Sequence, residues 1–486
     1  MALTSPKVYD IHTSRCARGG GVIPSLETED GNGAGTGPVR GPAPGKRGAD
    51  LLARLVAQGA QGVRVRRLGG DRAGEMRVTR FLRNPAVTIE EMIATGFART
   101  ERACAGRDVL AVQDTTVTRS PPEGGTGSFL HATIAVDAAS GAVLGALDAQ
   151  FLERIGGAKA SRLQRSFEDR QSARWLAATE RAGALRGAAR ITVVADREAD
   201  VFELFARRPA HVDLLVRAMH DRALADGGSR RTGRDRMAAR IAAGPCLGHA
   251  ALDLPARPGV AARTARLSVR FGRLDLAPPP ESRRARPQPL AMSDVDLREQ
   301  DPPEGATPVH WRLLSSRPVE TVAEALDAAA RYAMRWRIEE VFRTMKRKGF
   351  DIEALRIADT APRNRLVLAC LIAATVVLQM TGARDGGAGA GEGAPVLRPL
   401  TDALDPDDRP LLEAVSRSLE GRTARQKNPH PPGSLAFAAW VCARLGGWTG
   451  YYGKPGPIVI LGGWTEFQSI KRGAHLARTI GKHCDV

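Results

Sequence analysis

Apolar positions along this chain follow two periods, and the change from one period to the other predicts its elements. Residues 108–114 (DVLAVQD) and 191–196 (ITVVAD) are short, β-branched apolar runs that each end in an aspartate. Such runs are typical of central strands buried on both faces of a sheet. Between them, residues 131–152 alternate apolar and polar side chains around a Ser-Gly turn, which predicts a hairpin. The pattern therefore predicts a sheet whose two buried strands end in carboxylates.

Helical periodicity surrounds these strands. Residues 49–58 and 88–104 carry helical patterns separated by an Asn-Pro break, with Thr88 placed to cap the second helix. Residues 166–185 predict a helix that leads into the second aspartate strand. Residues 199–208 predict the helix that leaves it, and a further strand follows at 212–219.

Residues 220–318 change character and predict an all-β insertion. Three alternating runs, at 263–276, 290–297 and 309–316, are separated by prolines. After them, residues 331–349 (RYAMRWRIEEVFRTMKRKG) predict one long helix. The longest apolar run, 366–380, is shorter than the ~20 residues that span a bilayer, so a buried helix is expected.

These patterns divide the chain into regions of different composition. In chain order they are a flexible Gly/Pro-rich tail, a helical region, the first part of an α/β core, the β-rich insertion, the second part of the core, and a Gly-rich linker with a C-terminal helical region. Their bounds are 1–49, 50–105, 106–219, 220–318, 319–381 and 382–486.

Composition adds a bias in charge. The chain has 486 residues, of which 43% are hydrophobic and 26% charged, and a formal net charge of +18. That excess favours a polyanionic partner, nucleic acid first and an acidic membrane surface second. Arginine usage in a high-GC genome is the alternative explanation. The six cysteines form no C-x-x-C pair, so a zinc ribbon is not expected. Scattered single cysteines and the lack of a signal pattern at the start predict a cytoplasmic protein.

The predicted helix at 331–349 combines seven basic residues with two adjacent glutamates. At ~100° per residue, Tyr332, Arg335, Glu339 and Lys346 share an arc of about 60° beside the apolar face, whereas Glu340 falls on the exposed side. Glu339 is therefore the glutamate placed to do chemistry at the lip of a cleft. The alternative is a surface i,i+4 ladder that contributes only ~0.3–0.5 kcal/mol.

Three carboxylates of different segments can then form one site. Asp114 and Asp196 end strands whose side chains converge on one edge of a sheet, and Glu339 can join them. An aspartate at a strand end is also a common turn former. Three carboxylates suit Mg²⁺, and two such ions can activate a nucleophile and stabilise the leaving oxygen of a phosphodiester.

The motifs around these residues resemble a known family. The segments VQDTT around Asp114 and DREAD from Asp196, with the spacing Tyr332-x2-Arg335-x3-Glu339-x6-Lys346, are similar to bacterial DDE transposases of the insertion-sequence-four family, whose members include the transposon-five transposase. The resemblance spans roughly residues 50–475. It also takes in RFLRNP near the start and RLGGWTGYYGKPGP near the end.

The resemblance implies an α/β fold: an RNase H-like mixed sheet core with an all-β insertion, flanked by N- and C-terminal helical regions. It implies that Asp114, Asp196 and Glu339 are catalytic and hold Mg²⁺ or Mn²⁺, with two ions in each active site. The family's DNA contacts map onto five further residues: Tyr332, Arg335, Lys346, Trp311 and Arg217. Trp311 matches a tryptophan that stacks on a flipped base. A tryptophan that packs a strand face is the alternative.

The same resemblance implies a cut-and-paste transposase. Its partners are double-stranded DNA, as transposon inverted-repeat ends and as target, and a second copy of the chain in a synaptic complex at the bacterial nucleoid, with no membrane. Region 50–105 corresponds to the DNA-end-binding part, and the C-terminal helices to the dimer contacts. Residues 1–48 depart from the family's usual start, and a tyrosine is missing from RVTRF at 77–81. The alternatives are an inactive or domesticated DNA-end-binding repressor and a metal nuclease that does not transpose.

Overall fold

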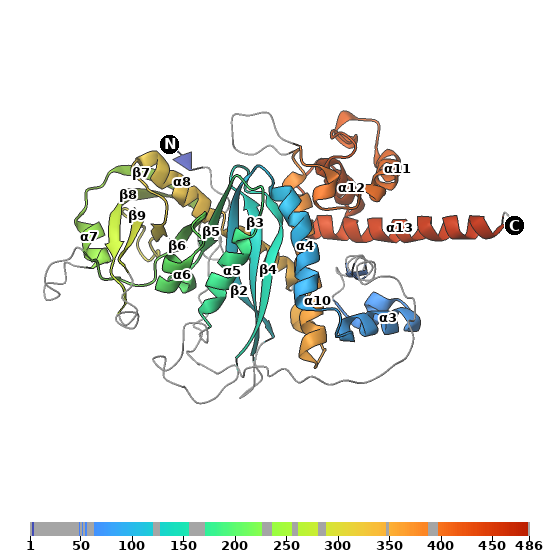
Figure 1. Cartoon of the computed structure of the whole chain (residues 1–486). Coiled ribbons are helices and arrows are strands. Elements are labelled where there is room, and N and C mark those ends of the chain that lie inside the picture. The colour runs from blue at the N-terminus through green and yellow to red at the C-terminus, as the bar shows by residue number, and fades with distance from the viewer. Residues whose placement is uncertain are drawn as a thin grey trace, which may run out of the picture.

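One sheet runs through the molecule and joins the predicted core to the predicted insertion (Figure 1). The computed structural model describes residues 2–3, 48, 51, 54–55, 63–119, 127–154, 171–225, 236–254, 261–279, 288–346, 349–386 and 397–484. The predicted tail at 1–49 and the Gly-rich part of the linker lie almost entirely outside these residues, as does most of the predicted helix at 49–58.

The sheet has ten strands in the order β1-β7-β8-β9-β10-β6-β5-β2-β3-β4. Only the pairs β1–β7, β2–β5 and β5–β6 are parallel. The bounds are β1 (Ala2–Leu3), β2 (Asp108–Arg119), β3 (Gly127–Asp137), β4 (Val143–Arg154), β5 (Arg190–Ala195), β6 (Val212–Arg217), β7 (Gly248–Leu254), β8 (Arg263–Leu276), β9 (Leu290–Glu299) and β10 (His310–Ser315).

Helices cover both faces of the sheet and extend from one end of it (Figure 1). The helices are α2 (Val65–Gly69), α3 (Arg72–Arg83), α4 (Ile89–Cys104), α5 (Ala173–Gly183), α6 (Phe202–Arg207), α7 (Met237–Ala243), α8 (Val322–Ala333), α9 (Trp336–Met345), α10 (Thr360–Ala383), α11 (Arg409–Leu419), α12 (Leu435–Leu445) and α13 (Pro457–Cys484). Short 3-10 turns are η1 (Arg197–Ala199), η3 (Ile352–Ala354), η4 (Leu400–Asp402), η5 (Pro406–Asp408) and η6 (Ala424–Gln426).

Strands β2 and β5 are central and buried on both faces, as their apolar runs predict. Leu110 and Val112 of β2 pack into the core that contains α8, α9 and α10, whereas Val109 and Ala111 pack into the core on the side of α5 and α6. All four side chains are 0% exposed. Side chains of one strand therefore pack into both hydrophobic cores, because successive side chains point to opposite faces of the sheet. The predicted hairpin is also confirmed, as β3 and β4.

The predicted insertion contains its three strands but is not all β. Strands β8, β9 and β10 match the alternating runs closely. However, helix α7 lies within the region and packs beside β8, so the all-β prediction is wrong in this detail. The insertion strands also continue the core sheet through the antiparallel pair of β10 with β6. A strand at the sheet edge has unpaired backbone groups, and this pairing satisfies them.

The single helix predicted at 331–349 is wrong. Helix α8 ends at Ala333 and α9 begins at Trp336. At the junction, the amides of Arg335, Arg337 and Ile338 donate to carbonyls three residues earlier. These are the tighter bonds of a 3-10 turn. The chain then leaves the helical conformation at Lys346, so the assumption of one continuous stripe from Tyr332 to Lys346 fails.

The apolar run at 366–380 lies in a buried helix, as predicted, but the helix is longer than the run. Helix α10 is long and apolar enough to cross a membrane by length and composition alone. In its most apolar window, 83% of the residues are buried inside the protein. Helix α10 contacts β4, α9 and α12, so it is a central packing element of this fold.

Helix α4 begins where its cap signal predicts. The Thr88 hydroxyl accepts a hydrogen bond from the Glu91 amide at 3.1 Å and so caps α4. Asn84 ends α3 immediately before the predicted proline break. These local signals are confirmed because a cap needs only residues within one turn.

Candidate active site

The two predicted aspartates lie side by side at one end of the parallel strands. β2 and β5 pair in parallel up to Gln113 opposite Ala195, and Asp114 and Asp196 are the next residues on the two strands. Beyond this point β5 ends and the chain turns into η1. The convergence of Asp114 and Asp196 is therefore confirmed. The prediction that Asp114 ends its strand is wrong, because β2 continues to Arg119 in its pairing with β3.

Arg335 links two of the three predicted carboxylates. Its guanidinium donates to Asp114 Oδ2 at 2.9 Å and to Glu339 Oε1 at 2.5 Å. Only 5% of the Arg335 side chain is exposed, so it is more buried than a residue at a cleft lip. The 3-10 turn between α8 and α9 directs Arg335 at β2 while Glu339 lies one turn further along. Asp114 and Glu339 are therefore brought together through a cation.

Tyr332 reaches the third carboxylate. Its hydroxyl donates to Asp196 Oδ1 at 3.2 Å, and its ring is almost completely buried. The last turn of α8 and the first turn of α9 thus contact all of the predicted catalytic carboxylates. The Asp196 charge adds to burial in raising the pKa of the Tyr332 hydroxyl, so the tyrosine is a neutral donor at physiological pH.

Burial dominates the electrostatics of the site. It raises the pKa of Asp114 to about 6, although the Arg335 charge and the Thr115 amide act in the opposite direction. Burial likewise raises the pKa of Glu339 to about 7, again opposed by Arg335. For Arg335, burial acts to lower the pKa, but the surrounding carboxylates outweigh it and the pKa is raised. The site therefore has an excess of half-buried negative charge that one guanidinium offsets only in part.

The carboxylates have the right chemistry for a hard cation, but the guanidinium of Arg335 bridges two of them. Asp114, Asp196 and Glu339 offer only oxygen donors, the set that Mg²⁺ and Mn²⁺ prefer. Within the described residues, however, no three Asp, Glu, His or Cys side chains are grouped as they would be around a metal ion. Arg335 holds Asp114 and Glu339 by direct ion pairs. The donor set thus fits a divalent cation if the guanidinium moves.

Two further predicted residues lie next to Tyr332. The rings of Trp311 and Tyr332 meet edge to face, with their centroids 5.5 Å apart. Arg217 donates to the His310 carbonyl at 2.9 Å and also hydrogen-bonds Tyr332. β6 and β10 are paired at this point, with Arg217 opposite Leu313. Trp311 and Arg217 are therefore neighbours of the carboxylate site, as predicted.

Lys346 does not join this group. It is the residue after α9, and its ammonium pairs with Glu353 at 3.5 Å. The stripe that would have aligned Lys346 with Tyr332 requires an unbroken helix. The two glutamates do differ as expected. Glu340 pairs with Arg337 at 2.8 Å rather than with Arg335, and its side chain is half-buried rather than fully exposed.

A polar network behind Asp114 is absent from the sequence prediction. Thr115, the residue after Asp114, bonds His131 Nδ1 at 3.0 Å and accepts from Arg174 at 3.4 Å. Arg174 also pairs with Glu198 of the DREAD segment at 2.9 Å. Burial lowers the pKa of His131 well below its usual value, so this histidine is neutral. In the sequence, only the place of Thr115 next to Asp114 in the VQDTT motif pointed to this network. The partners of Thr115 lie far away in sequence and could not be predicted.

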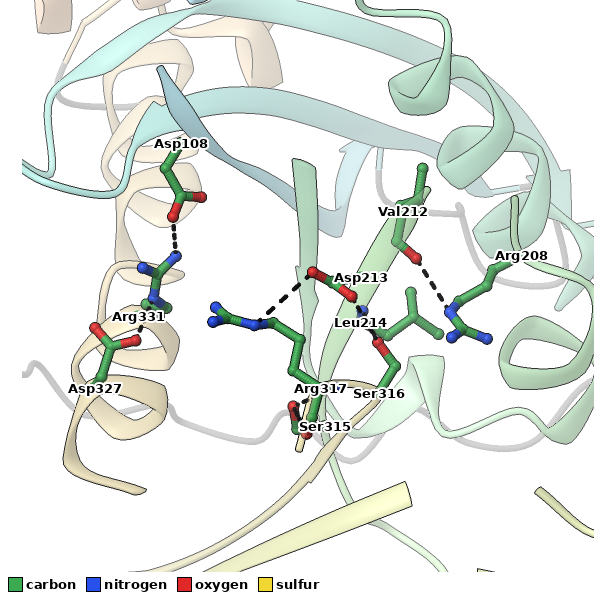
Figure 2. Close-up of polar contacts among 10 residues, drawn as sticks. All are labelled: Asp108, Arg208, Val212, Asp213, Leu214, Ser315, Ser316, Arg317, Asp327 and Arg331. Carbon is green, nitrogen blue, oxygen red and sulfur yellow. Dashed lines mark hydrogen bonds and ion pairs between the residues drawn. The ribbon is translucent and has the colours of Figure 1, made fainter. Parts of the chain in front are cut away.

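The helix that carries Tyr332 is also anchored at the first residue of β2. Figure 2 shows Arg331 between Asp108, which begins β2, and Asp327 of α8. The distances are 2.9 Å to Asp108 and 2.6 Å to Asp327. Arg331 and Arg335 lie one helical turn apart. Their two ion pairs to β2 set the position of the α8–α9 junction along the strand.

Part of the chain is similar to a known family. Residues 170–376 match the model of the transposase DDE domain. The match contains Asp196, Glu339 and the whole α8–α9 junction, as well as the insertion strands. It begins after Asp114, which is placed in the site by its contacts alone. The match supports a DDE transposase, a nucleotidyl-transferase type of enzyme whose family acts on DNA.

Proposed function

We propose that this chain is a cut-and-paste DNA transposase of the insertion-sequence-four type. In this proposal it cleaves the ends of a mobile element and joins the exposed 3′-hydroxyls to target DNA. The observation that carries the proposal is the α8–α9 junction. This junction lies in the region that matches a DDE domain. There Arg335 contacts Asp114 and Glu339, and Tyr332 contacts Asp196.

An RNase H-like core is part of the proposal. Strands β4, β3 and β2 form an antiparallel meander, and β5 and β6 continue the sheet in parallel from β2. This mixed arrangement supports such a core. The insertion between β6 and α8 lies where the family resemblance expects it, and it adds its strands to the edge at β6.

Asp114, Asp196 and Glu339 are the proposed ligands of two Mg²⁺ or Mn²⁺ ions. When bound, these ions would activate the attacking hydroxyl and stabilise the leaving oxygen of the phosphodiester. The raised pKa of Asp114 and Glu339 supports this assignment, because two half-buried carboxylates whose charge Arg335 offsets only in part favour a further cation.

Arg335 has two proposed roles. Without DNA it neutralises Asp114 and Glu339. With DNA bound, a phosphate of the transposon end competes for its guanidinium, which suits bidentate phosphate contacts. Release of the two carboxylates would then coincide with arrival of the substrate. Tyr332 keeps the Asp196 carboxylate oriented.

Arg217, Trp311 and Lys346 are proposed to position the DNA. Arg217 and Trp311 flank Tyr332, where a base displaced from the duplex end can stack on the half-buried indole. Lys346 lies at the end of α9, where it can contact a phosphate further along the strand if its exposed ion pair with Glu353 opens.

The proposed reaction has four transfers at one site: hydrolysis of one strand, hairpin closure, hydrolytic hairpin opening and joining to target DNA. Hydrolysis of one strand leaves a 3′-hydroxyl on the transposon end. This hydroxyl attacks the opposite strand and closes a hairpin, and after the hairpin opens the same hydroxyl attacks target DNA. Each step exchanges one oxygen for another at phosphorus, so no covalent bond to the protein is needed.

A homodimer on paired ends is the proposed working form. Helix α13 projects away from the body of the molecule (Figure 1). Its described residues beyond Ile470 are partly or fully exposed. A long exposed helix of this kind offers a surface for a second copy.

A strand-transfer assay on paired inverted repeats from the DNA that flanks the gene tests the proposal. We expect Mg²⁺-dependent products from the wild-type chain. Glu339→Gln should abolish these products and retain DNA binding, since it removes one charge and almost no volume. Glu340→Gln is the matched control, because Glu340 pairs with Arg337 outside the site.

The outcomes separate the alternatives. A wild-type chain that binds the repeats and gives no cleavage or joining under any divalent cation is a DNA-end-binding repressor. Cleavage without joining identifies a nuclease. Full activity in Glu339→Gln would refute the assignment of Glu339.

A further inference from the structure

An open groove lies in the C-terminal helical region, away from the carboxylates. It has a volume of about 750 Å³ and runs between η6 and the loop that joins α12 to α13. The lining residues that matter here are Arg425, Arg444, Trp448, Thr449, Tyr451 and Tyr452. We call this surface the tyrosine groove. None of its lining residues belongs to the site described above.

Two tyrosines face solvent at this groove. Tyr452 is 84% exposed and Tyr451 is 46% exposed. They are the only aromatic residues among the large apolar side chains that are exposed in the described part of the chain. An exposed ring leaves apolar surface in water, so two adjacent rings at a groove indicate a binding surface.

The backbone beneath the tyrosines is held in place. Arg444, at the end of α12, donates to the carbonyls of Trp448 at 3.2 Å and Thr449 at 2.6 Å. The Trp448 indole donates to the Gly453 carbonyl at 3.0 Å. Gly450 has φ +88°, and a Cβ there would lie 3.0 Å from the Arg425 carbonyl. The loop therefore presents Tyr451 and Tyr452 from a hydrogen-bonded frame.

The charge around the tyrosine groove is positive. Arg425 lines it, and Arg422 and Lys427 on the same short segment are exposed. No aspartate or glutamate is among the lining residues. A partner with both negative charge and flat apolar faces fits this combination best.

We infer that the tyrosine groove binds a DNA strand with unpaired bases. Base faces stack on exposed aromatic rings and the phosphates meet the arginines, the usual chemistry of sequence-tolerant single-strand binding. Duplex DNA hides its base faces and would use only the charges. The inference takes DNA as the partner from the proposed function, but it concerns a surface separate from the catalytic carboxylates.

Fluorescence anisotropy with a labelled twelve-nucleotide thymidine strand and with the matching duplex tests this inference on the full-length chain. Tyr452→Ala should weaken binding of the single strand about fivefold to 100-fold, the range for loss of one stacked base. Binding of the duplex should change much less. Tyr452→Phe is the matched control, because it keeps the ring and should bind the strand as the wild type does.

A second variant examines the charges. Arg425→Gln should reduce the slope of log affinity against log salt by about 0.7 for the single strand, the value for one lost phosphate contact. Both changes lie at exposed side chains, so the melting temperature should stay that of the wild type. Bromodeoxyuridine in the strand should crosslink to Tyr451 or Tyr452 in the wild type.

Three results would overturn the inference. One is equal strand affinity for Tyr452→Ala and Tyr452→Phe. Another is crosslinking confined to other parts of the chain. The last is a Tyr452→Ala chain whose oligomeric mass by sedimentation differs from that of the wild type while its affinity for the single strand does not. That result would identify the groove as an interface between two copies. If the wild type binds the single strand but gives no strand-transfer products, that result counts against the proposed function and leaves this inference standing.

Discussion

Arg335→Gln is the substitution that most directly probes the candidate active site, because one buried guanidinium holds two half-buried carboxylates. The side chain is 5% exposed and lies 2.9 Å from Asp114 Oδ2. Glutamine keeps a polar group at the position but removes the charge. The half-buried carboxylates of Asp114 and Glu339 would then lie close together without a cation between them.

The size of the effect follows from those contacts. Removing one partner of a buried ion pair costs about 3–5 kcal/mol, because a buried charge is left uncompensated. Hydrogen bonds to charged groups contribute about 1.5–3 kcal/mol each. A divalent cation that binds the wild-type carboxylates in place of Arg335 must replace two such hydrogen bonds. Cation affinity in the absence of DNA should therefore be weaker in the wild type than in Arg335→Gln by about a hundredfold or more.

Thermal or urea unfolding with and without Mn²⁺ measures both effects. Without metal, Arg335→Gln should be less stable than the wild type by about 3–5 kcal/mol. Metal at a hundred times its dissociation constant should restore about 2.7 kcal/mol in the variant and far less in the wild type. Direct titration followed by the electron paramagnetic resonance of free Mn²⁺ gives the affinities independently of unfolding.

The control is Arg337→Gln, which removes a neighbouring arginine that pairs with Glu340 on a half-buried surface. It should cost about 1 kcal/mol or less and leave Mn²⁺ affinity unchanged. Equal Mn²⁺ affinities for the wild type and Arg335→Gln would refute the view that Arg335 competes with the cation. Equal stabilities without metal would refute the energetic value given to its ion pairs.

Three other predictions concern the scaffold. Burial, followed by a neighbouring carboxylate, raises the pKa of Asp294 to about 7. Its carboxyl ionises first in the unfolded chain, near pH 4, so stability should fall as pH rises from about 4 to about 7; Asp294→Asn should flatten this dependence in urea unfolding, and an unchanged pH profile would contradict it. A Cβ at Gly463 would lie 1.6 Å from the Cys442 carbonyl oxygen, whereas one at Gly462 meets nothing within 4 Å. Gly463→Ala should therefore lower stability by about 1–3 kcal/mol or more, while Gly462→Ala should be neutral or stabilising, and equal melting temperatures would refute this packing. Asp108→Asn removes the ion pair that anchors α8 on β2 and should lower the free energy of unfolding by about 1–2 kcal/mol. An unchanged melting temperature would show that this ion pair does not stabilise the fold.

Local signals in the sequence were enough for most strands and for several helix ends, but they did not predict β7, α2 or α3. β2 and β5 could be predicted because a strand buried on both faces requires an uninterrupted apolar run, and that run is visible in six or seven residues. Thr88 and the Asn-Pro break identified the start of α4 for the same reason, since caps act within one turn. The aspartates could be placed at one edge once their strands were taken as parallel neighbours.

The break between α8 and α9 could not be predicted from periodicity. Residues 331–349 have no proline and their only glycine is the last, so nothing local ends the helix at Ala333. The junction is instead associated with tertiary contacts, in which Arg331 and Arg335 both pair with β2. Tertiary contacts of this kind override helical propensity, and they also separate Lys346 from the other three residues of its motif.

The network behind Asp114 shows the same limit. Thr115 is adjacent to a predicted site residue, but His131 comes from β3 and Arg174 from α5. Sequence carries no mark of such a contact, because the partners meet only when the sheet has formed and α5 covers it. The same holds for the pairing of β10 with β6, which joins the insertion to the core.

By itself, the sequence predicted the candidate site residues: two aspartates that follow buried apolar runs and a glutamate in a basic helical segment. Periodicity and motif spacing are properties of neighbouring residues, so they can be recognised before the chain folds. Only the tertiary structure decided that Arg335 is buried and bridges Asp114 to Glu339, and that the tyrosine groove lies open beside α12. Burial and long-range ion pairs depend on which distant segments meet, and one-dimensional patterns do not record that.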